Sequence, residues 1–142
     1  MSLSRAIPPF TSAFEAEFAT WIASYSGSIS DQEYFQRSWV LNNPGRSPPF
    51  EIHSSFVTYT KDRYKVVDTI LHYNHEEEGK AAKLKIVVKS SEVLGRIRQA
   101  HVTVLGHVGQ DKTFNYLSEH YWGITRLAVR KVLQNCAVCA MK

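Results

Sequence analysis

Two histidines and two cysteines near the C-terminal end of the chain have the side chains and the spacing of a metal site. His101 and His107 are separated by five residues, Cys136 and Cys139 by two, and 28 residues lie between the two pairs. Two imidazoles and two thiolates are a common tetrahedral ligand set for structural zinc. Because four protein ligands leave the metal no open position, we predict one structural Zn²⁺ that activates no water.

A redox dithiol is the alternative for the Cys136 and Cys139 pair. Two cysteines this close together are too few for the disulfide framework of a secreted domain. A redox pair of this spacing belongs at the start of a helix, where the dipole lowers the thiol pKa. The apolar pattern instead places Cys136 at the end of a helix, which favours the metal site.

Other histidines support weaker metal hypotheses. His72 and His75 flank a predicted hairpin turn and could bind a second ion together with Glu76, but three ligands in a turn are weak evidence for a site. His120 could compete for the first site, although its place at a helix end is more simply that of a packed or exposed side chain.

The histidines are expected on one helix and in the loop that follows it. Ser90 or Ser91 can cap a helix whose apolar face reaches His101. Gly106 and Gly109 are expected to allow the sharp loop around the second histidine. These two glycines form no phosphate-binding motif, because that motif needs a preceding strand and a Gly-Lys-Ser or Gly-Lys-Thr ending.

Two more helices are expected to complete a three-helix module. The first runs from Asp111 to about Trp122, and the second opens at Thr125 and continues its apolar face to Cys136. A unit of this size has little core, and structural zinc can supply on the order of 10 kcal/mol of apparent folding free energy. A single core side chain supplies roughly 2 kcal/mol. The predicted core residues are Phe114, Leu117, Tyr121, Trp122, Val129 and Leu133.

Upstream of the module, the patterns predict helices and then strands, so the fold class is α+β. Thr11 can cap a helix that continues to Gly27, and Ser30 can cap a second one. Strands with a hairpin around Glu76 to Lys80 should follow a turn-rich linker, because the segments concerned are rich in β-branched and aromatic residues. These segments are residues 51–60, 63–73 and 84–89, and the predicted domain limits are 1–62, 63–89 and 90–142.

Charge divides the chain into two unlike parts. Residues 1–79 contain 6 Lys or Arg and 10 Asp or Glu, a balance of −4, whereas residues 80–142 contain 11 and 3, a balance of +8. A small basic module has the electrostatic character of a polyanion binder. The residues expected to reach phosphates are Lys112, Arg126, Arg130 and Lys131, with a solvated helix face as the alternative. The module's aromatic residues have the spacing of a buried face rather than of a base-stacking platform.

Together these residues resemble the zinc-binding N-terminal module of retroviral and long-terminal-repeat retrotransposon integrases, the His-His-Cys-Cys type. The likeness covers residues 90–142, and the preceding strands resemble the hairpin of gypsy-type elements back to residue 63, while residues 1–60 resemble no family. Two departures are Lys89, where a proline is usual, and Gly123 directly after Trp122, where a Pro-Gly pair is common. The matching residues are His101, Gly106-His107-x-Gly109-x-x-Lys112-Thr113, Tyr121-Trp122 and Cys136-x-x-Cys139.

The resemblance implies a role in DNA integration through DNA binding at element ends and multimerisation. In the family an RNase H-like catalytic domain with two aspartates and a glutamate follows the last cysteine, whereas this sequence ends at Lys142. None of the upstream acids is placed to replace that triad, so we expect no enzymatic activity from these residues. The alternative is a zinc-stabilised protein-interaction module in a domesticated protein. An enzyme in residues 1–88 is disfavoured, since no nucleophile and base are arranged there.

The sequence also limits the expected location and ligands. It contains neither the continuous apolar stretch of a secretory signal nor a run long enough to cross a bilayer. We therefore expect an intracellular protein, nuclear if it acts on DNA, with no membrane partner and no small-molecule substrate. DNA is the expected partner, and self-association or binding to an integrase-like protein is the second.

Overall fold

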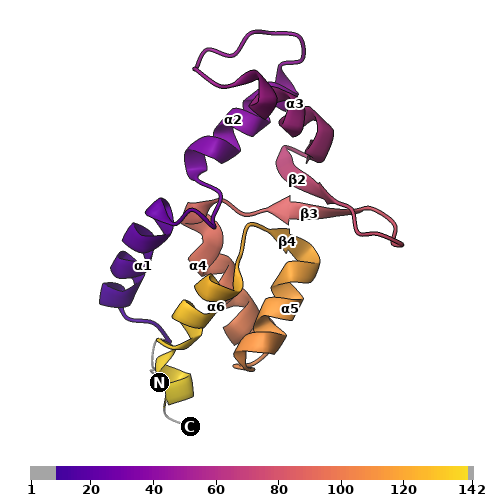
Figure 1. Ribbon diagram of the computed structural model, residues 1–142. Coiled ribbons are helices and arrows are strands. Elements are labelled where there is room, and N and C mark those ends of the chain that lie inside the picture. The colour runs from indigo at the N-terminus through magenta and orange to yellow at the C-terminus, as the bar shows by residue number, and fades with distance from the viewer. Residues whose placement is uncertain (1–8, 141–142) are drawn as a thin grey trace.

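The computed structural model describes residues 9–140 and confirms the α+β class (Figure 1). A helical unit forms one half of the molecule, and a small sheet with two helices forms the other. No helix in the described part is long and apolar enough to span a membrane. The elements are α1 (Ser12–Ser24), α2 (Asp31–Asn42), α3 (Ser54–Arg63), β1 (Tyr64–Val67), β2 (Ile70–His75), β3 (Lys83–Val87), α4 (Ser90–Arg98), the π-helix η1 (Gln99–Val104), α5 (Gln110–His120), β4 (Tyr121–Trp122), α6 (Arg126–Leu133) and α7 (Ala137–Ala140).

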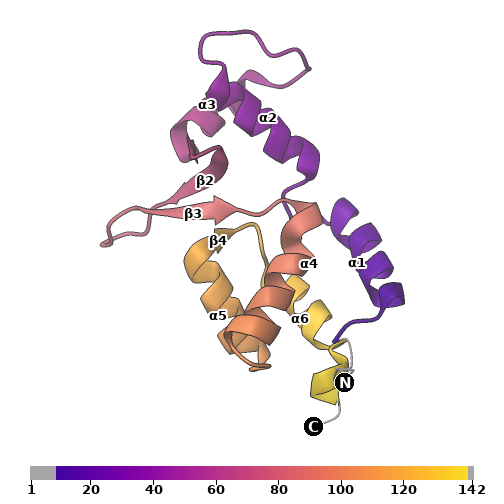
Figure 2. The same ribbon diagram turned by 180° about the vertical axis from the view of Figure 1, so that it is seen from behind.

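Four helices enclose the core of the helical unit. Seen from behind, α4 crosses the middle of this unit, with α5 on one side and α1 on the other (Figure 2). Each of α1, α4, α5 and α6 contributes a side chain that is at most 1% exposed, namely Phe18, Ile97, Leu117 and Val129. The helical core therefore depends on contacts between segments far apart in sequence.

Helix α1 belongs to this core, although the sequence separates it from the zinc module. Thr11 caps the helix as predicted, since its side chain accepts a hydrogen bond from the backbone N–H of Phe14. Phe14, Phe18 and Ile22 recur at helical spacing and are all buried. An ion pair between Glu15 and Arg98 joins α1 to α4. The three-part division of the chain remains a prediction, but residues 90–140 share their core with α1.

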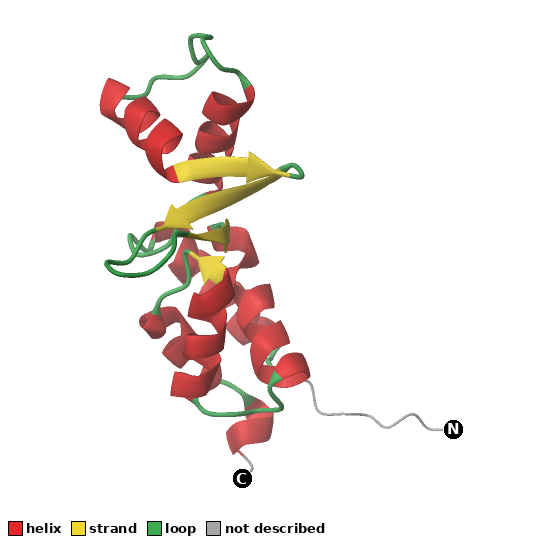
Figure 3. Ribbon diagram, turned by 90° about the vertical axis from the view of Figure 1, so that its right-hand side faces the viewer, coloured by secondary structure: helices red, strands yellow, loops and turns green. Residues whose placement is uncertain are grey.

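The sheet lies between the helical unit and the pair α2 and α3 (Figure 3). Its strand order is β1-β2-β3-β4, with antiparallel pairing among the first three strands and a short parallel pairing of β4 with β3. The β2 and β3 pair confirms the predicted hairpin around residues 76–80. Asp68 and Thr69 connect β1 to β2 with φ angles of 52° and 65°, the left-handed conformation of a tight turn.

A second core lies on the face of the sheet that α2 covers. Tyr64, Leu71, Tyr73 and Val87 are buried there. Trp122 stacks on Tyr73 with ring centroids 3.8 Å apart and an interplanar angle of 7°. This aromatic pair links β4, the strand that leads into the helical unit, to β2 in the middle of the sheet.

A buried arginine connects α2 to α3. Arg37 is only 8% exposed; its guanidinium donates to Glu33 at 2.9 Å and to Thr60 at 2.6 Å. The same group lies over the rings of Phe56 and Tyr64, 4.2 Å and 4.5 Å from their centroids. Charge pairing and cation–π contacts thus compensate for the lost hydration of the guanidinium.

The strand predicted for residues 51–60 is wrong, because this segment leads into α3. His53 caps the helix by accepting from the backbone N–H of Ser55, and Phe56 and Thr60 lie one turn apart, where both meet Arg37. The β-branched composition favoured a strand, but strand propensity depends on context and tertiary contacts override it here.

Two helix limits also differ from the prediction. The residue at the N-cap of α4 is Lys89 rather than Ser90 or Ser91, and the Ser90 hydroxyl donates instead to the carbonyl of Ile29 at 3.0 Å. Helix α5 ends at His120, and the next two residues form β4. The Ser90 side chain thus bonds to a distant segment instead of capping its own helix, and the Trp122 carbonyl accepts from the N–H of Val88 at 2.8 Å.

Candidate metal centre

His101 lies at the buried end of the α4 face. It is 0% exposed and lies four residues beyond Ile97, which is also 0% exposed. The segment around it is the π-helix η1, in which the N–H of Leu105 donates to the carbonyl of Ala100 at 2.9 Å. Such wider turns occur often at functional sites, and this one comes immediately before the loop to the second histidine.

His107 is placed by a loop that folds the chain back on η1. Gly106 and His107 have φ angles of 72° and 63°, so two successive residues adopt the left-handed conformation. The N–H of His107 donates to the carbonyl of His101. The expected need for glycine is confirmed at Gly106, but it is wrong for Gly109, which has an ordinary φ of −68° as the N-cap of α5.

A buried threonine holds the other side of this loop. Thr113 is 0% exposed, and its hydroxyl donates to the carbonyl of Gly109 at 2.9 Å. The sequence offered it only as part of the Lys-Thr pair in the family resemblance and predicted no contact for it. A threonine hydroxyl often donates to the carbonyl four residues earlier in a helix. This contact was therefore predictable from the position of the helix start.

Cys136 and Cys139 lie on either side of a helix start rather than at the end of one helix. Cys136 is buried just after α6, and Cys139 lies in the single turn of α7, whose Ala140 N–H donates to the Cys136 carbonyl at 3.1 Å. The N–H of Ala137 donates to the carbonyl of Pro9 at 2.8 Å. The prediction that this pair ends a helix is therefore wrong, although the three-residue spacing still directs both sulfurs to one side.

The four side chains converge on one point. Their ligand atoms all lie within 4.8 Å of one another. His107 Nδ1 is 3.2 Å from His101 Nε2, 3.5 Å from Cys136 Sγ and 3.6 Å from Cys139 Sγ, and His101 Nε2 is 3.2 Å from Cys139 Sγ. A tetrahedral zinc with nitrogen ligands at about 2.0–2.1 Å and sulfur ligands at about 2.3 Å has edges of about 3.3–3.8 Å. These four separations are close to the edges of such a tetrahedron.

Charge balance supports the same assignment. Cys136 and His101 are 1% and 0% exposed, so the site is largely shielded from water. A divalent cation with two thiolates and two neutral imidazoles has no net charge, which removes most of the cost of burying an ion. Residues 88–142 match the family described as the integrase zinc binding domain. No curated protein and no solved structure matches the chain.

Residues 88–142 are thus similar to the integrase zinc binding domain, and zinc is the metal that the His-His-Cys-Cys tetrad fits. The match covers this domain and no catalytic domain. Among the described residues, the tetrad is the group of histidine, cysteine and acidic side chains arranged to hold a metal. His75 contacts Glu77 instead of Glu76, at 3.0 Å, and the exposed His120 packs against Tyr116. Neither hypothesis for another histidine ligand is supported.

Side chains predicted as the core of the zinc binding domain divide between the two cores. Leu117 and Val129 are buried in the helical core, and Phe114, Tyr121 and Leu133 pack against it while partly exposed. Trp122 instead packs against the core of the sheet. The reason is β4: successive strand residues point to opposite faces, so Tyr121 and Trp122 face different cores.

The four predicted DNA-contacting residues do not form one surface. Arg126 pairs with Asp111 at 3.1 Å, and its guanidinium lies over the Phe114 ring on α5. Lys131 lies 5.0 Å from the centroid of Trp21 on α1, which places it on the other side of α6. Lys112 and Arg130 are exposed. Arg126 therefore faces α5, whereas Lys131 faces α1.

Proposed function

We propose that this chain acts as the non-catalytic, zinc-binding part of an integrase-like protein of mobile-element origin, contributing DNA binding and multimerisation to DNA integration. The match of residues 88–142 to the integrase zinc binding domain, together with the closed His-His-Cys-Cys tetrad, carries the proposal. Zinc has a structural role here, because four protein ligands leave no position for substrate or water. A protein with this role would act in the nucleus.

The charge of the chain supports DNA as the partner. Residues 80–142 carry a balance of +8, from 11 Lys or Arg and 3 Asp or Glu. Lys112 and Arg130 are exposed and have no carboxylate within ion-pair distance among residues 9–140. Arg126 needs only to exchange an exposed, weak pair with Asp111 to reach a phosphate. We propose these three as the phosphate contacts and leave Lys131 out.

A protein-interaction module is the second candidate. Two apolar side chains on different parts of the surface support it, since Leu127 on α6 is 43% exposed and Phe35 on α2 is 59% exposed. In this case zinc would maintain the fold while an apolar surface recruits a partner chain or a second copy. Scattered exposed apolar residues are common on monomers, which makes this the weaker proposal.

Salt dependence separates the two candidates. The zinc-loaded chain is titrated with a fluorescent DNA duplex at several salt concentrations, and its oligomeric mass is measured in parallel. Phosphate-driven binding should weaken steeply with salt, with a log–log slope of about −0.9 per phosphate contact. Replacing Lys112 and Arg130 by Gln should lower that slope, whereas the same changes at the exposed Lys61 and Lys65 should not. Salt-independent association without DNA binding would favour the interaction module.

A further inference from the structure

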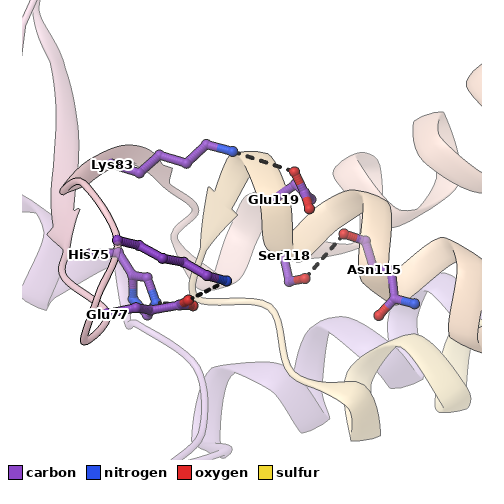
Figure 4. Close-up of polar contacts among 7 residues, drawn as sticks. His75, Glu77, Lys83, Asn115, Ser118 and Glu119 are labelled. Atoms are coloured by element: carbon purple, nitrogen blue, oxygen red, sulfur yellow. Dashed lines mark hydrogen bonds and ion pairs between the residues drawn. The ribbon is translucent and has the colours of Figure 1, made fainter.

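A hollow of about 310 Å³ lies between the β2–β3 hairpin and the C-terminal end of α5. The hairpin contributes Lys80, Lys83 and Lys85, and α5 contributes Ser118 and Glu119. Figure 4 shows Lys83 extending from the hairpin to Glu119, while the Ser118 hydroxyl donates to the carbonyl of Asn115 at 3.1 Å. Three ammonium groups at one small hollow repel one another unless anions are present.

Part of that positive charge is balanced inside the protein. Lys80 Nζ lies 3.0 Å from Glu77, and the hydrogen bond from Lys80, followed by one from His75, lowers the pKa of Glu77 to about 2. Glu77 is therefore a carboxylate at neutral pH and neutralises Lys80. Lys83 is 3.5 Å from Glu119, and both side chains are at least half exposed, so this pair is weak and exchangeable.

Lys85 is the cation that the protein does not balance. It lies opposite Tyr73 in the β2–β3 register, so it points to the same face as Lys83 two residues earlier. Its side chain is half-buried, and no carboxylate of residues 9–140 comes within ion-pair distance. A partly desolvated ammonium group without a counterion favours binding of an anion.

A second hollow of about 270 Å³ adjoins the first and has a different chemistry. Both hollows are lined by Lys85 and Ser118, and the second is otherwise formed by Phe114, Tyr121, Trp122 and neighbouring loop residues. A ligand that occupies both hollows therefore needs an anionic group next to a flat, largely apolar one. A nucleotide unit, with a phosphate beside a base, has this arrangement.

We propose that the two adjoining hollows bind a single-stranded end of a nucleic acid. A backbone phosphate lies between Lys85 and Lys83, and the neighbouring base enters the aromatic hollow. A duplex keeps its bases stacked inside and must extrude one to fill this hollow, whereas a single strand does not. The dipole of α5 disfavours an anion at the C-terminal end of this helix. This field acts only over the last turn, and it is weaker than the attraction from the ammonium groups of Lys83 and Lys85. The inference rests on the proposed role in DNA binding and defines where a single-stranded end would bind.

Binding of a labelled oligothymidylate of about twelve nucleotides to the full, zinc-loaded chain tests the inference. Fluorescence anisotropy is measured for the wild type, for Lys85→Gln and for Lys65→Gln. Lys65 is an exposed lysine whose β1 register places it on the opposite face of the same sheet, so its replacement changes net charge equally. Lys85→Gln should weaken binding about tenfold and reduce the salt slope by about 0.7, the value for one phosphate of a single strand. Lys65→Gln should change affinity less than about twofold, as a charge distant from the site.

A second pair of variants tests for an increase in affinity, which a misfolded protein would not show. Glu119→Gln releases Lys83 and should tighten oligothymidylate binding about threefold, in the range expected for loss of an exposed pair. Glu92→Gln adds the same net charge at the exposed start of α4, away from both hollows, and should have little effect.

The outcomes separate the site from the wider function. Equal losses for Lys85→Gln and Lys65→Gln, or equal gains for the two glutamate variants, would overturn the hollow as a site while leaving DNA binding in place. Oligothymidylate binding that is weaker than duplex binding in the wild type would also overturn it. If the wild type binds neither DNA form at low salt, both the inference and the proposed DNA-binding function fail.

Discussion

The two cores of this protein are stabilised in different ways. The helical core holds the four zinc ligands, which come from two pairs separated by 28 residues and converge on one point. The sheet core contains no metal ligands and is held by strand pairing, the stacked Tyr73 and Trp122 rings and the buried Arg37. The helical core contains more helices than the sheet core. The segments that carry its zinc ligands, however, are short and have little regular secondary structure.

This contrast indicates which of the two cores needs a metal. Antiparallel strands joined by tight turns close short loops, whose entropic cost is small. The loop that carries His101 and His107 must instead be joined to the turn that carries Cys136 and Cys139 by side chains alone. Helix α7, which contains Cys139, has only four residues and adds little stability of its own. Structural zinc can supply on the order of 10 kcal/mol for such closure. We therefore expect the helical core to depend on zinc and the sheet core to depend on aromatic packing.

Loss of one ligand should give the largest effect. His107→Ala removes a half-buried ligand without opening a cavity in the core, and it should abolish zinc binding and most of the helical circular dichroism of the helical unit. His120→Ala removes an exposed histidine and should keep both properties. Zinc content by elemental analysis and far-ultraviolet circular dichroism check the pair. A His107→Ala protein that retains zinc and helix content would show that the metal does not close this core.

Helix α1 offers the next test, because it lies outside the family match but inside the helical core. Phe18→Ala should destabilise the protein by about 3–5 kcal/mol and weaken zinc binding, since Phe18 is 1% exposed. Phe35→Ala, at a side chain 59% exposed, should stay within about 0.5 kcal/mol of the wild type. Urea unfolding and competition with a zinc chelator measure both quantities. Unchanged zinc affinity in Phe18→Ala would mean that residues 88–142 are independent of α1.

These two pairs also show what the sequence can and cannot predict. The zinc ligands were predictable because two close pairs of coordinating side chains, one of histidines and one of cysteines, point to one tetrahedral geometry, whatever the surrounding structure. The packing of α1 was not, since an amphipathic helix indicates that one face is buried but not which partner buries it. Residues 51–60 were mispredicted for a related reason: the β-branched pattern is local, whereas Arg37, which meets Phe56 and Thr60, lies in another helix.

The sheet core should fail at alkaline pH rather than on metal removal. Burial raises the pKa of Tyr64 to about 12 from its ordinary value of 10.0. The folded state thus favours the neutral phenol, so this contribution to stability is complete below pH 10 and is lost as the pH rises from about 10 to 12. A shift of about two pKa units limits the loss to at most about 3 kcal/mol.

Two measurements check the alkaline loss. Thermal unfolding between pH 9 and 12 should show a steeper decline for the wild type than for Tyr64→Phe, which lacks the ionisable group. The tyrosinate absorbance that the folded wild type shows in excess of Tyr64→Phe should appear only toward the upper end of this range. If both proteins lose stability in parallel, the burial of Tyr64 does not govern the alkaline limit of the sheet core.

The smallest expected effect concerns the loop that presents His107 to the metal. Gly106 has a φ of 72° and no atom within 4 Å of the position that a Cβ would occupy, so Gly106→Ala introduces only backbone strain. This strain costs about 1–2 kcal/mol. Gly109→Ala adds the same methyl group in equally open space but at a φ of −68°, and it should cost almost nothing. Because the left-handed turn orients His107 Nδ1, the strain in Gly106→Ala should reduce zinc affinity by about tenfold, as measured by chelator competition. Equal affinities for the two variants would mean that the metal, and not the backbone, sets the conformation of this loop.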